Sequence, residues 1–268
     1  MSQIEKAKVF AELHVKGRPI ILYNAWDAGS AKAIADAGAK AIATSSWAVA
    51  AAQGFKDGED LPIAVAEQIV SRIAATVEKP VTMDFEGGYS DDDGALASNI
   101  ERILDLGIVG INFEDRVVKG KGLYGVDRQA SRISAIRVAA DRKGIPLFIN
   151  ARTDVYLGNG DDLEEALKRG KAYANAGASG FFVPGVRVPD HIRRLASETP
   201  IPVNVMVMDG VPANDELAKL GVARVSYGAL PYAEAMSTLR QKAGKLFCEP
   251  ASKSATSMAA DSPAAARQ

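Results

Sequence analysis

The sequence predicts an α/β protein folded as a (β/α)8 TIM-type barrel. Short Val/Ile-rich runs alternate eight times with longer amphipathic runs. The short runs are nearly continuous in apolar residues, which is typical of parallel strands buried on both faces. Eight such units in 268 residues fit a closed barrel better than a doubly wound open sheet, which remains the alternative.

The predicted strands are mostly preceded by a glycine-containing pair or a proline, the break expected where a helix ends. They lie near residues 20–24, 41–46, 80–86, 108–114, 146–152, 180–185, 202–207 and 223–227. Helical spacing of apolar residues follows each strand. The corresponding helices are expected at 29–38, 62–77, 94–106, 128–143, 161–176, 190–198, 213–220 and 231–246. An extra helix at 2–16 is expected to pack under the barrel.

The domain organisation follows from the same pattern. We expect one barrel domain over residues 1–248. Residues 249–268 are rich in Ala, Ser and Pro and contain no large aliphatic residues, so a disordered tail is expected there.

Composition narrows the class of protein. The 32 Lys and Arg residues balance 33 Asp and Glu residues, which gives no indication of a nucleic-acid partner. The single cysteine, Cys248, excludes an intramolecular disulfide and suits the reducing cytoplasm, where we expect the protein to be. We expect no signal peptide at the N-terminus, and the apolar runs are too short to span a membrane.

Three neighbouring predicted strands end in pairs of polar residues spaced by two. The pairs are Asp84 and Glu86, Asn112 and Glu114, and Asn150 and Arg152. This spacing places both members of a pair on one face of a strand. In a (β/α)8 barrel the active site lies at the carboxyl ends of the strands, where all three pairs fall.

The three pairs would gather three carboxylates around one guanidinium. Two carboxylates about 4 Å apart repel by about 4 kcal/mol at an effective dielectric constant of about 20. A divalent cation would relieve this repulsion, and oxygen ligands without nearby His or Cys favour Mg²⁺, or Mn²⁺, over zinc. The alternative is a core layer in which Arg152 alone pairs with the carboxylates.

Seven ordered motifs carry a resemblance to a known family. They are Asn-Ala-Trp-Asp-Ala-Gly-Ser-Ala (24–31), Ser-Ser-Trp (45–47), Gly-Phe-Lys-Asp (54–57), Asp-Phe-Glu-Gly-Gly-Tyr (84–89), Gly-Ile-Asn-Phe-Glu-Asp (110–115), Asn-Ala-Arg-Thr-Asp (150–154) and Phe-Val-Pro-Gly (182–185). Over roughly residues 18–232 the chain resembles the isocitrate lyase/phosphoenolpyruvate mutase superfamily.

The resemblance implies a role for each of these positions. Asp84 would be the main Mg²⁺ ligand, with Glu86 and Glu114 acting through metal-bound water. Ser45 and Ser46 would hold a substrate carboxylate. Further site residues implied by the family are Asp57, in contact with the metal-water network or substrate; Arg152, paired with substrate oxygens; and Asn24, Trp47, Asn112 and Asn204, which would line the pocket.

The segment after the fourth strand departs from the family. Lyases of isocitrate and methylisocitrate carry Lys-Lys-Cys-Gly-His there, and the phosphoenolpyruvate mutases usually carry Lys-Asn-Ser. This chain reads Arg-Val-Val-Lys-Gly-Lys-Gly-Leu-Tyr-Gly over 116–125. True isocitrate or methylisocitrate lyase activity is therefore not expected. The segment is either a gate hinged at its glycines or an ordinary solvated loop. A milder departure is Glu86, where many relatives carry aspartate.

Three functions remain open from the sequence. The first is a Mg²⁺-dependent lyase or decarboxylase of a small 2-oxo or 2-hydroxy carboxylate, acting through an enolpyruvate-like intermediate, with Lys121 or water as proton donor. The second is phosphoenolpyruvate mutase or phosphonopyruvate hydrolase chemistry, and the third is a non-catalytic 2-oxo acid binding protein. The resemblance also implies a homo-oligomer, a tetramer that exchanges the C-terminal helix.

Overall fold

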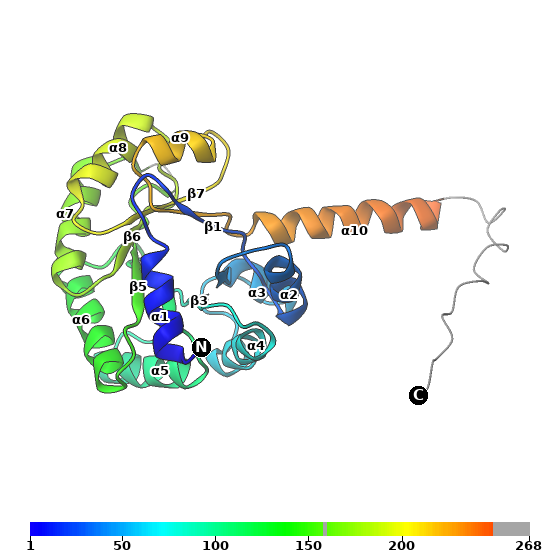
Figure 1. Ribbon diagram of the computed structural model, residues 1–268, viewed down its shortest axis with the longest axis horizontal. Helices are drawn as coiled ribbons and strands as arrows, with labels where there is room; N and C mark the ends of the chain where they lie inside the picture. Colours follow the sequence, from blue (N-terminus) through cyan, green and yellow to red (C-terminus); the bar gives the residue numbers. More distant parts are fainter. Residues whose placement is uncertain (158–159, 249–268) are drawn as a thin grey trace. The chain divides into compact units, whose positions relative to one another are not determined.

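Eight parallel strands form one sheet at the centre of the fold (Figure 1). The computed structural model describes residues 1–157 and 160–248. The strands are β1 (Ile20–Leu22), β2 (Ile42–Ala43), β3 (Val81–Asp84), β4 (Gly110–Glu114), β5 (Phe148–Arg152), β6 (Gly180–Phe182), β7 (Val203–Met206) and β8 (Arg224–Ser226). They are hydrogen-bonded in the order β1-β8-β7-β6-β5-β4-β3-β2.

The first and last strands of this order nearly close the sheet into a barrel. A single parallel bridge joins Ala25 to Thr44 beyond the ends of β1 and β2. There the Ala25 amide donates to the Ala43 carbonyl at 2.8 Å. In a doubly wound sheet β1 would lie inside the order, so the structure confirms the predicted (β/α)8 barrel.

Helices alternate with the strands as the periodicity predicts. They are α1 (Gln3–Glu12), α2 (Ala28–Asp36), α3 (Ser46–Ala52), α4 (Ile63–Thr76), α5 (Asp93–Asp105), α6 (Val126–Arg142), α7 (Leu163–Asn175), α8 (Pro189–Glu198), α9 (Asn214–Lys219) and α10 (Leu230–Cys248). The sequence analysis missed α3, because it extended the second strand to residue 46. The Ser45 side chain instead caps α3 by accepting from the Ala48 amide.

The chain divides into two compact units. One spans Met1–Tyr232, and the second begins at Ala233. The predicted tail, residues 249–268, lies outside the residues that the structure describes. Within the described part of the chain, no helix is both long and apolar enough to cross a membrane.

Helix α1 forms the floor of the barrel. It begins at a capping box between Ser2 and Glu5, and it buries Ala7 and Phe10. The Phe10 ring lies 5.4 Å from the ring of Phe148 on β5, with the two rings at a steep angle. Because Phe148 belongs to the barrel strands, this contact confirms that the N-terminal helix packs under the barrel.

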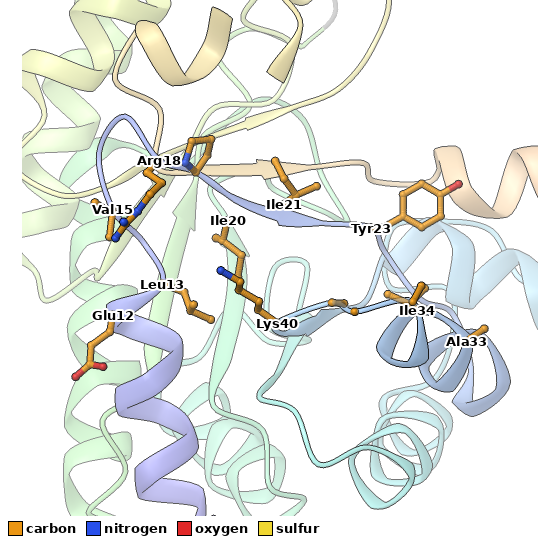
Figure 2. A pocket seen from close by; sticks show the side chains of 14 residues that line it. Glu12, Leu13, Val15, Arg18, Ile20, Ile21, Tyr23, Ala33, Ile34 and Lys40 are labelled. Carbon is orange, nitrogen blue, oxygen red and sulfur yellow. The ribbon is translucent and has the colours of Figure 1, made fainter. Parts of the chain in front are cut away.

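A cavity of about 870 Å³ is lined by the segment from Glu12 to Tyr23, which includes β1, and by α2 with the residues that follow it (Figure 2). The end of α1 contributes Leu13, β1 contributes Ile20 and Ile21, and α2 contributes Ile34. Its lining is mostly apolar, with Arg18 and Lys40 among the charged side chains. None of the polar pairs at the strand ends lines this cavity, so it is separate from the predicted site.

Removing the Phe10 ring should destabilise the barrel floor. Phe10 is fully buried, so Phe10→Ala should lower the free energy of unfolding by about 3–5 kcal/mol, measured by urea denaturation. Ile4→Ala, at an exposed position of the same helix, should cost well under about 1 kcal/mol. Equal losses in the two variants would contradict the packing role assigned to Phe10.

Candidate active site

The strand register brings the predicted polar pairs together at one end of the barrel. Asp84 lies beside Asn112 in the pairing of β3 with β4. Glu114 lies beside Arg152 in the pairing of β4 with β5. Asn112 and Glu114 are spaced by two along β4, so they share a face of that strand. The carboxylates of β3 and β4 therefore converge on the same side of the sheet.

Asp84 is the centre of this group. Its Oδ2 atom accepts hydrogen bonds from the backbone amide of Ser46 at 3.0 Å and from the Ser46 hydroxyl at 2.9 Å. Its Oδ1 atom accepts from the side-chain amide of Asn112 at 3.3 Å. Because Ser46 begins α3, the short strand β2 and its immediate turn into a helix place these two donors at Asp84.

The Ser46 hydroxyl also lies 3.1 Å from Oδ1 of Asp57. A hydroxyl has one proton, so it can donate to only one of these two carboxylates at a time. Burial raises the pKa of Asp57, and repulsion from Asp84 adds to the rise. The Ser46 hydroxyl therefore cannot donate to Asp57 and Asp84 at the same time, and one of the two carboxylates goes without this hydrogen bond.

Glu86 is held by the loop that follows α3. Its Oε2 atom accepts from the backbone amides of Gly58 at 2.9 Å and Glu59 at 2.7 Å. The Glu86 backbone has a φ of 51°, the left-handed region in which residues other than glycine are strained. Burial raises the pKa of Glu86 to about 7, and repulsion from Asp57 and Asp84 contributes.

Glu114 and Arg152 form a buried ion pair. The Arg152 Nη1 atom lies 3.0 Å from Oε2 of Glu114. Arg152 is also held by Asp154, through Nε to Oδ1 at 2.6 Å and through Nη2 to Oδ2 at 3.0 Å. Burial raises the pKa of Glu114 above its ordinary value, and the Arg152 charge opposes this rise.

Sequence reasoning missed Asp154 as a site residue. Its spacing of two from Arg152 in Asn-Ala-Arg-Thr-Asp was a usable signal, because that spacing continues the face already occupied by Asn150 and Arg152. The Asp154 amide donates to the buried carboxylate of Asp115 at 3.0 Å. Asp115 in turn pairs with Arg169 at 2.9 Å. A second buried ion pair therefore supports the loop that carries Asp154.

The donor set fits a hard divalent cation. Repulsion from Asp84 raises the pKa of Asp57, and repulsion from Asp57 and Asp84 raises the pKa of Glu86, which indicates an excess of negative charge at the site. In the described residues no group of three or more His, Cys, Asp or Glu side chains is arranged to hold a metal ion directly. Magnesium keeps several waters and needs only one or two protein carboxylates, so this arrangement suits Mg²⁺ better than zinc.

Other predicted residues lie around or beneath this cluster. Asn24 fastens the barrel seam, donating to the Thr44 carbonyl at 2.7 Å and accepting from the amides of Tyr227 and Gly228. Asn204 is buried and accepts from Asn150 at 3.0 Å. These two side chains join neighbouring segments of the barrel.

Trp47 and Lys121 are exposed side chains. Trp47 is 45 % exposed and contacts the ring of Tyr232. Lys121 is exposed on the loop after β4. No hydrogen bond or ion pair connects Lys121 to the carboxylates within the described ranges.

The loop after β4 forms a short hairpin. Arg116 bridges Leu123, and the Tyr124 amide donates to the Asp115 carbonyl at 2.8 Å. Val118 packs against two glycines, since a Cβ atom on Gly87 would lie 2.7 Å from Val118 Cγ2 and one on Gly58 would lie 3.7 Å from Val118 Cγ1. The loop is therefore seated against the turn that follows Asp84 and Glu86.

Comparison with known proteins shows which family this chain is similar to. The family model for phosphoenolpyruvate phosphomutase matches residues 10–247. A solved structure from Burkholderia cenocepacia J2315, provisionally assigned as a phosphonomutase, is 45% identical with a TM-score of 0.88, covering 91% of this chain and 99% of that one.

Two curated relatives extend the comparison. An uncharacterised protein of Mycobacterium tuberculosis (strain ATCC 25618 / H37Rv) is 36% identical, covering 83% of each chain. The 2-methylisocitrate lyase of Bacillus subtilis (strain 168) is 28% identical, covering 84% of this chain and 76% of that one. The relatives with a stated activity are thus lyases or mutases, which supports an enzymatic role.

The raised pKa of Glu86 predicts a pH-dependent stability. The folded-state pKa of about 7 lies above the ordinary value of 4.5, so the folded protein holds this proton more tightly than the unfolded chain. The contribution of Glu86 to the free energy of unfolding should therefore fall as pH rises from about 4.5 to 7. In the presence of a chelator, the free energy of unfolding of Glu86→Gln should rise relative to that of the wild type by about 2–3 kcal/mol between pH 5 and pH 8.

Urea denaturation of both proteins at each pH measures this difference. Glu12→Gln, at an exposed position, reports how far loss of one carboxylate alone affects the measurement. If the difference in free energy of unfolding between Glu86→Gln and the wild type is the same at pH 5 and at pH 8, Glu86 carries no buried charge.

Because Val118 packs against Gly87, we predict that Gly87→Ala opens the loop that follows β4. The added Cβ would overlap Val118, and overpacking of this kind costs about 1–3 kcal/mol. A shift of about 1 kcal/mol toward the open loop should speed trypsin cleavage after Lys119 and Lys121 about fivefold. Gly125→Ala, in open space on the same loop, is the matched control.

The second substitution Val118→Ala removes the closest contact of the new methyl group and leaves the one with Oε1 of Glu59, at 3.0 Å. The Gly87→Ala/Val118→Ala protein should return toward the cleavage rate of Val118→Ala alone. Unchanged cleavage of Gly87→Ala would mean that Val118 does not hold the loop in place.

Proposed function

The chain belongs to the phosphoenolpyruvate phosphomutase family, and from this premise we propose that it is a Mg²⁺-dependent carbon–carbon lyase or decarboxylase. Its substrate would be a small 2-oxo or 2-hydroxy carboxylate, cleaved through an enolpyruvate-like intermediate. The observation that carries the proposal is the convergence of Asp84, Asp57 and Glu86 beside the Glu114–Arg152 ion pair.

Asp84 would hold the metal directly, with Glu86 and Glu114 acting through water. Mn²⁺ could replace Mg²⁺ on the same oxygen ligands. When bound, the ion would stabilise negative charge that develops on the oxygen of a 2-oxo acid. The excess of carboxylates over cations at the site supports this role for a cation.

Arg152 would bind and orient the substrate. Its guanidinium has five N–H groups, and its contacts with Glu114 and Asp154 engage three of them. The remaining N–H groups suit a carboxylate or enolate oxygen. Because Glu114 and Asp154 fix the guanidinium from two sides, a bound oxygen would meet a donor that is already positioned.

The remaining predicted residues would shape the pocket and supply a proton. Ser45, Ser46 and Trp47 start α3 beside Asp84, and backbone amides at a helix start suit a substrate carboxylate. The Ser46 donors are engaged by Asp84 in this structure, so substrate would have to share them. Lys121 on the loop, or water, would serve as proton donor, which requires the Lys121 side chain to turn inward.

The same loop argues against 2-methylisocitrate lyase activity. The residues over 116–125 include neither cysteine nor histidine. Phosphorus–carbon chemistry is the second candidate, because the matching family model is that of phosphoenolpyruvate phosphomutase and the 45% identical structure is provisionally a phosphonomutase. We retain it as the alternative that the test must separate.

Assembly and location complete the proposal. We propose that the chain forms a homo-oligomer, a tetramer by family resemblance, and acts in the cytoplasm without nucleic-acid or membrane partners. The near balance of charged residues is compatible with this, and mass photometry of the purified protein would measure the oligomeric state.

A substrate screen tests the proposed function. The protein is incubated with Mg²⁺ and, separately, oxaloacetate, 2-methylmalate-type acids or phosphonopyruvate, and release of pyruvate and phosphate is followed. Pyruvate without phosphate is the expected result. Phosphate or phosphoenolpyruvate would favour the second candidate, and tight binding of a 2-oxo acid without turnover would identify a binding protein.

Asp84→Ala is the control for metal dependence. It should abolish Mg²⁺-dependent ligand binding in calorimetry and turnover in the screen, while circular dichroism reports an intact fold. Mg²⁺ affinity equal to that of the wild type would show that Asp84 is not the metal ligand.

A further inference from the structure

Arg224 is a buried cation beneath the candidate site. It lies on β8 and is 1% exposed. Its Nη2 atom donates to Oδ1 of Asn112 at 3.0 Å, whereas its Nε and Nη1 atoms have no hydrogen-bond partner among the described residues. No carboxylate in those residues forms an ion pair with it. Burial without a direct counter-ion is costly, which calls for a specific role.

Arg224 fixes the orientation of the Asn112 amide. Asn112 Oδ1 accepts from Arg224 and also from Asn150 Nδ2 at 2.9 Å. A side-chain amide can turn over and exchange its oxygen and nitrogen, but Asn150 is itself held, because its Nδ2 also donates to Oδ1 of Asn204 at 3.0 Å and the Asn204 Nδ2 donates to the Val205 carbonyl at 2.8 Å. A guanidinium has donors only. Arg224 and Asn150 therefore both hold the oxygen of Asn112 in this orientation, and Arg224 is the partner that can never accept a hydrogen bond in place of donating one.

The Asn112 orientation decides what Asp84 meets. With its oxygen held by Arg224, Asn112 presents its Nδ2 to Oδ1 of Asp84 at 3.3 Å. In the reverse orientation an amide oxygen would face a carboxylate oxygen, two acceptors in repulsion. The Ser46 donors occupy Oδ2 of Asp84, so Oδ1 is the oxygen with more capacity left for a further ligand.

We propose that Arg224 is a positioning residue for Asp84, acting through the side-chain amide of Asn112 to hold the Oδ1 atom ready for a divalent cation. The inference rests on the proposed function, because it takes Asp84 as the metal ligand. Groups that orient metal ligands typically contribute about 10–100-fold to metal affinity.

The test compares Arg224→Gln with Arg224→Met in the full-length protein. The two variants are similar in size and both lack the charge, but only glutamine can donate a hydrogen bond to Asn112. Calorimetric titration with Mg²⁺ alone should show about tenfold weaker binding by Arg224→Met and a substantial recovery in Arg224→Gln. Equal losses in both variants would mean that Arg224 acts by charge alone, which overturns the inference.

Asn112→Ala tests the same path from the other side. It removes the receiving amide and leaves Arg224 in place, so about the same tenfold loss of Mg²⁺ affinity is expected. Wild-type affinity in this variant overturns the inference whether or not Arg224→Met folds. Thr82→Val, which alters a buried hydroxyl without a hydrogen-bond partner in the described residues, is the control for a change in the barrel interior.

Failure of the inference and failure of the proposed function give different results. A wild-type protein that binds no Mg²⁺ overturns both. A wild-type protein that binds Mg²⁺, together with an Arg224→Met variant that binds it equally well, overturns the role of Arg224 and leaves the proposed function standing.

Discussion

Excess negative charge at the carboxyl ends of β3 and β4 is the constraint on which the site depends. Asp84, Glu86 and Asp57 carry their negative charges close together, and repulsion from Asp84 raises the pKa of both Asp57 and Glu86. The structure supplies donors from three places: the start of α3 for Asp84, the backbone at Gly58 and Glu59 for Glu86, and Arg152 for Glu114. Each of these arrangements relieves part of the charge, and the part that is left favours a divalent cation.

The fold was predictable because it depends on periodicity. Eight apolar runs with amphipathic segments between them predicted the barrel, and the amphipathic segment before the first run predicted the helix under it. The exception is α3, where Ala-rich residues directly after β2 gave no contrast between a strand and a helix. The side chain of Ser45 alone sets the start of this helix, and a hydrophobic pattern does not locate a boundary that depends on one capping residue.

The candidate site was predictable only in part. Spacing of two identified the pairs on β3, β4 and β5, because the register of a parallel sheet aligns them. The same reasoning missed Asp154, which follows its strand, and Arg224, which lies on the opposite side of the barrel and reaches Asn112 across 112 positions of sequence. Contacts across the barrel interior depend on strand tilt and stagger, which a sequence pattern does not contain.

The seam between β1 and β2 has a mechanical consequence. One bridge closes the ring there, whereas β4 and β5 are paired over five residues. Backbone pairing is therefore sparser beside Thr44, where the Asn24 side chain adds a bond, than beside Glu114 and Arg152. Widening the ring would break fewer main-chain hydrogen bonds on the β1–β2 side than between β4 and β5, so the junction of the first two strands is where the cylinder is joined by the least backbone.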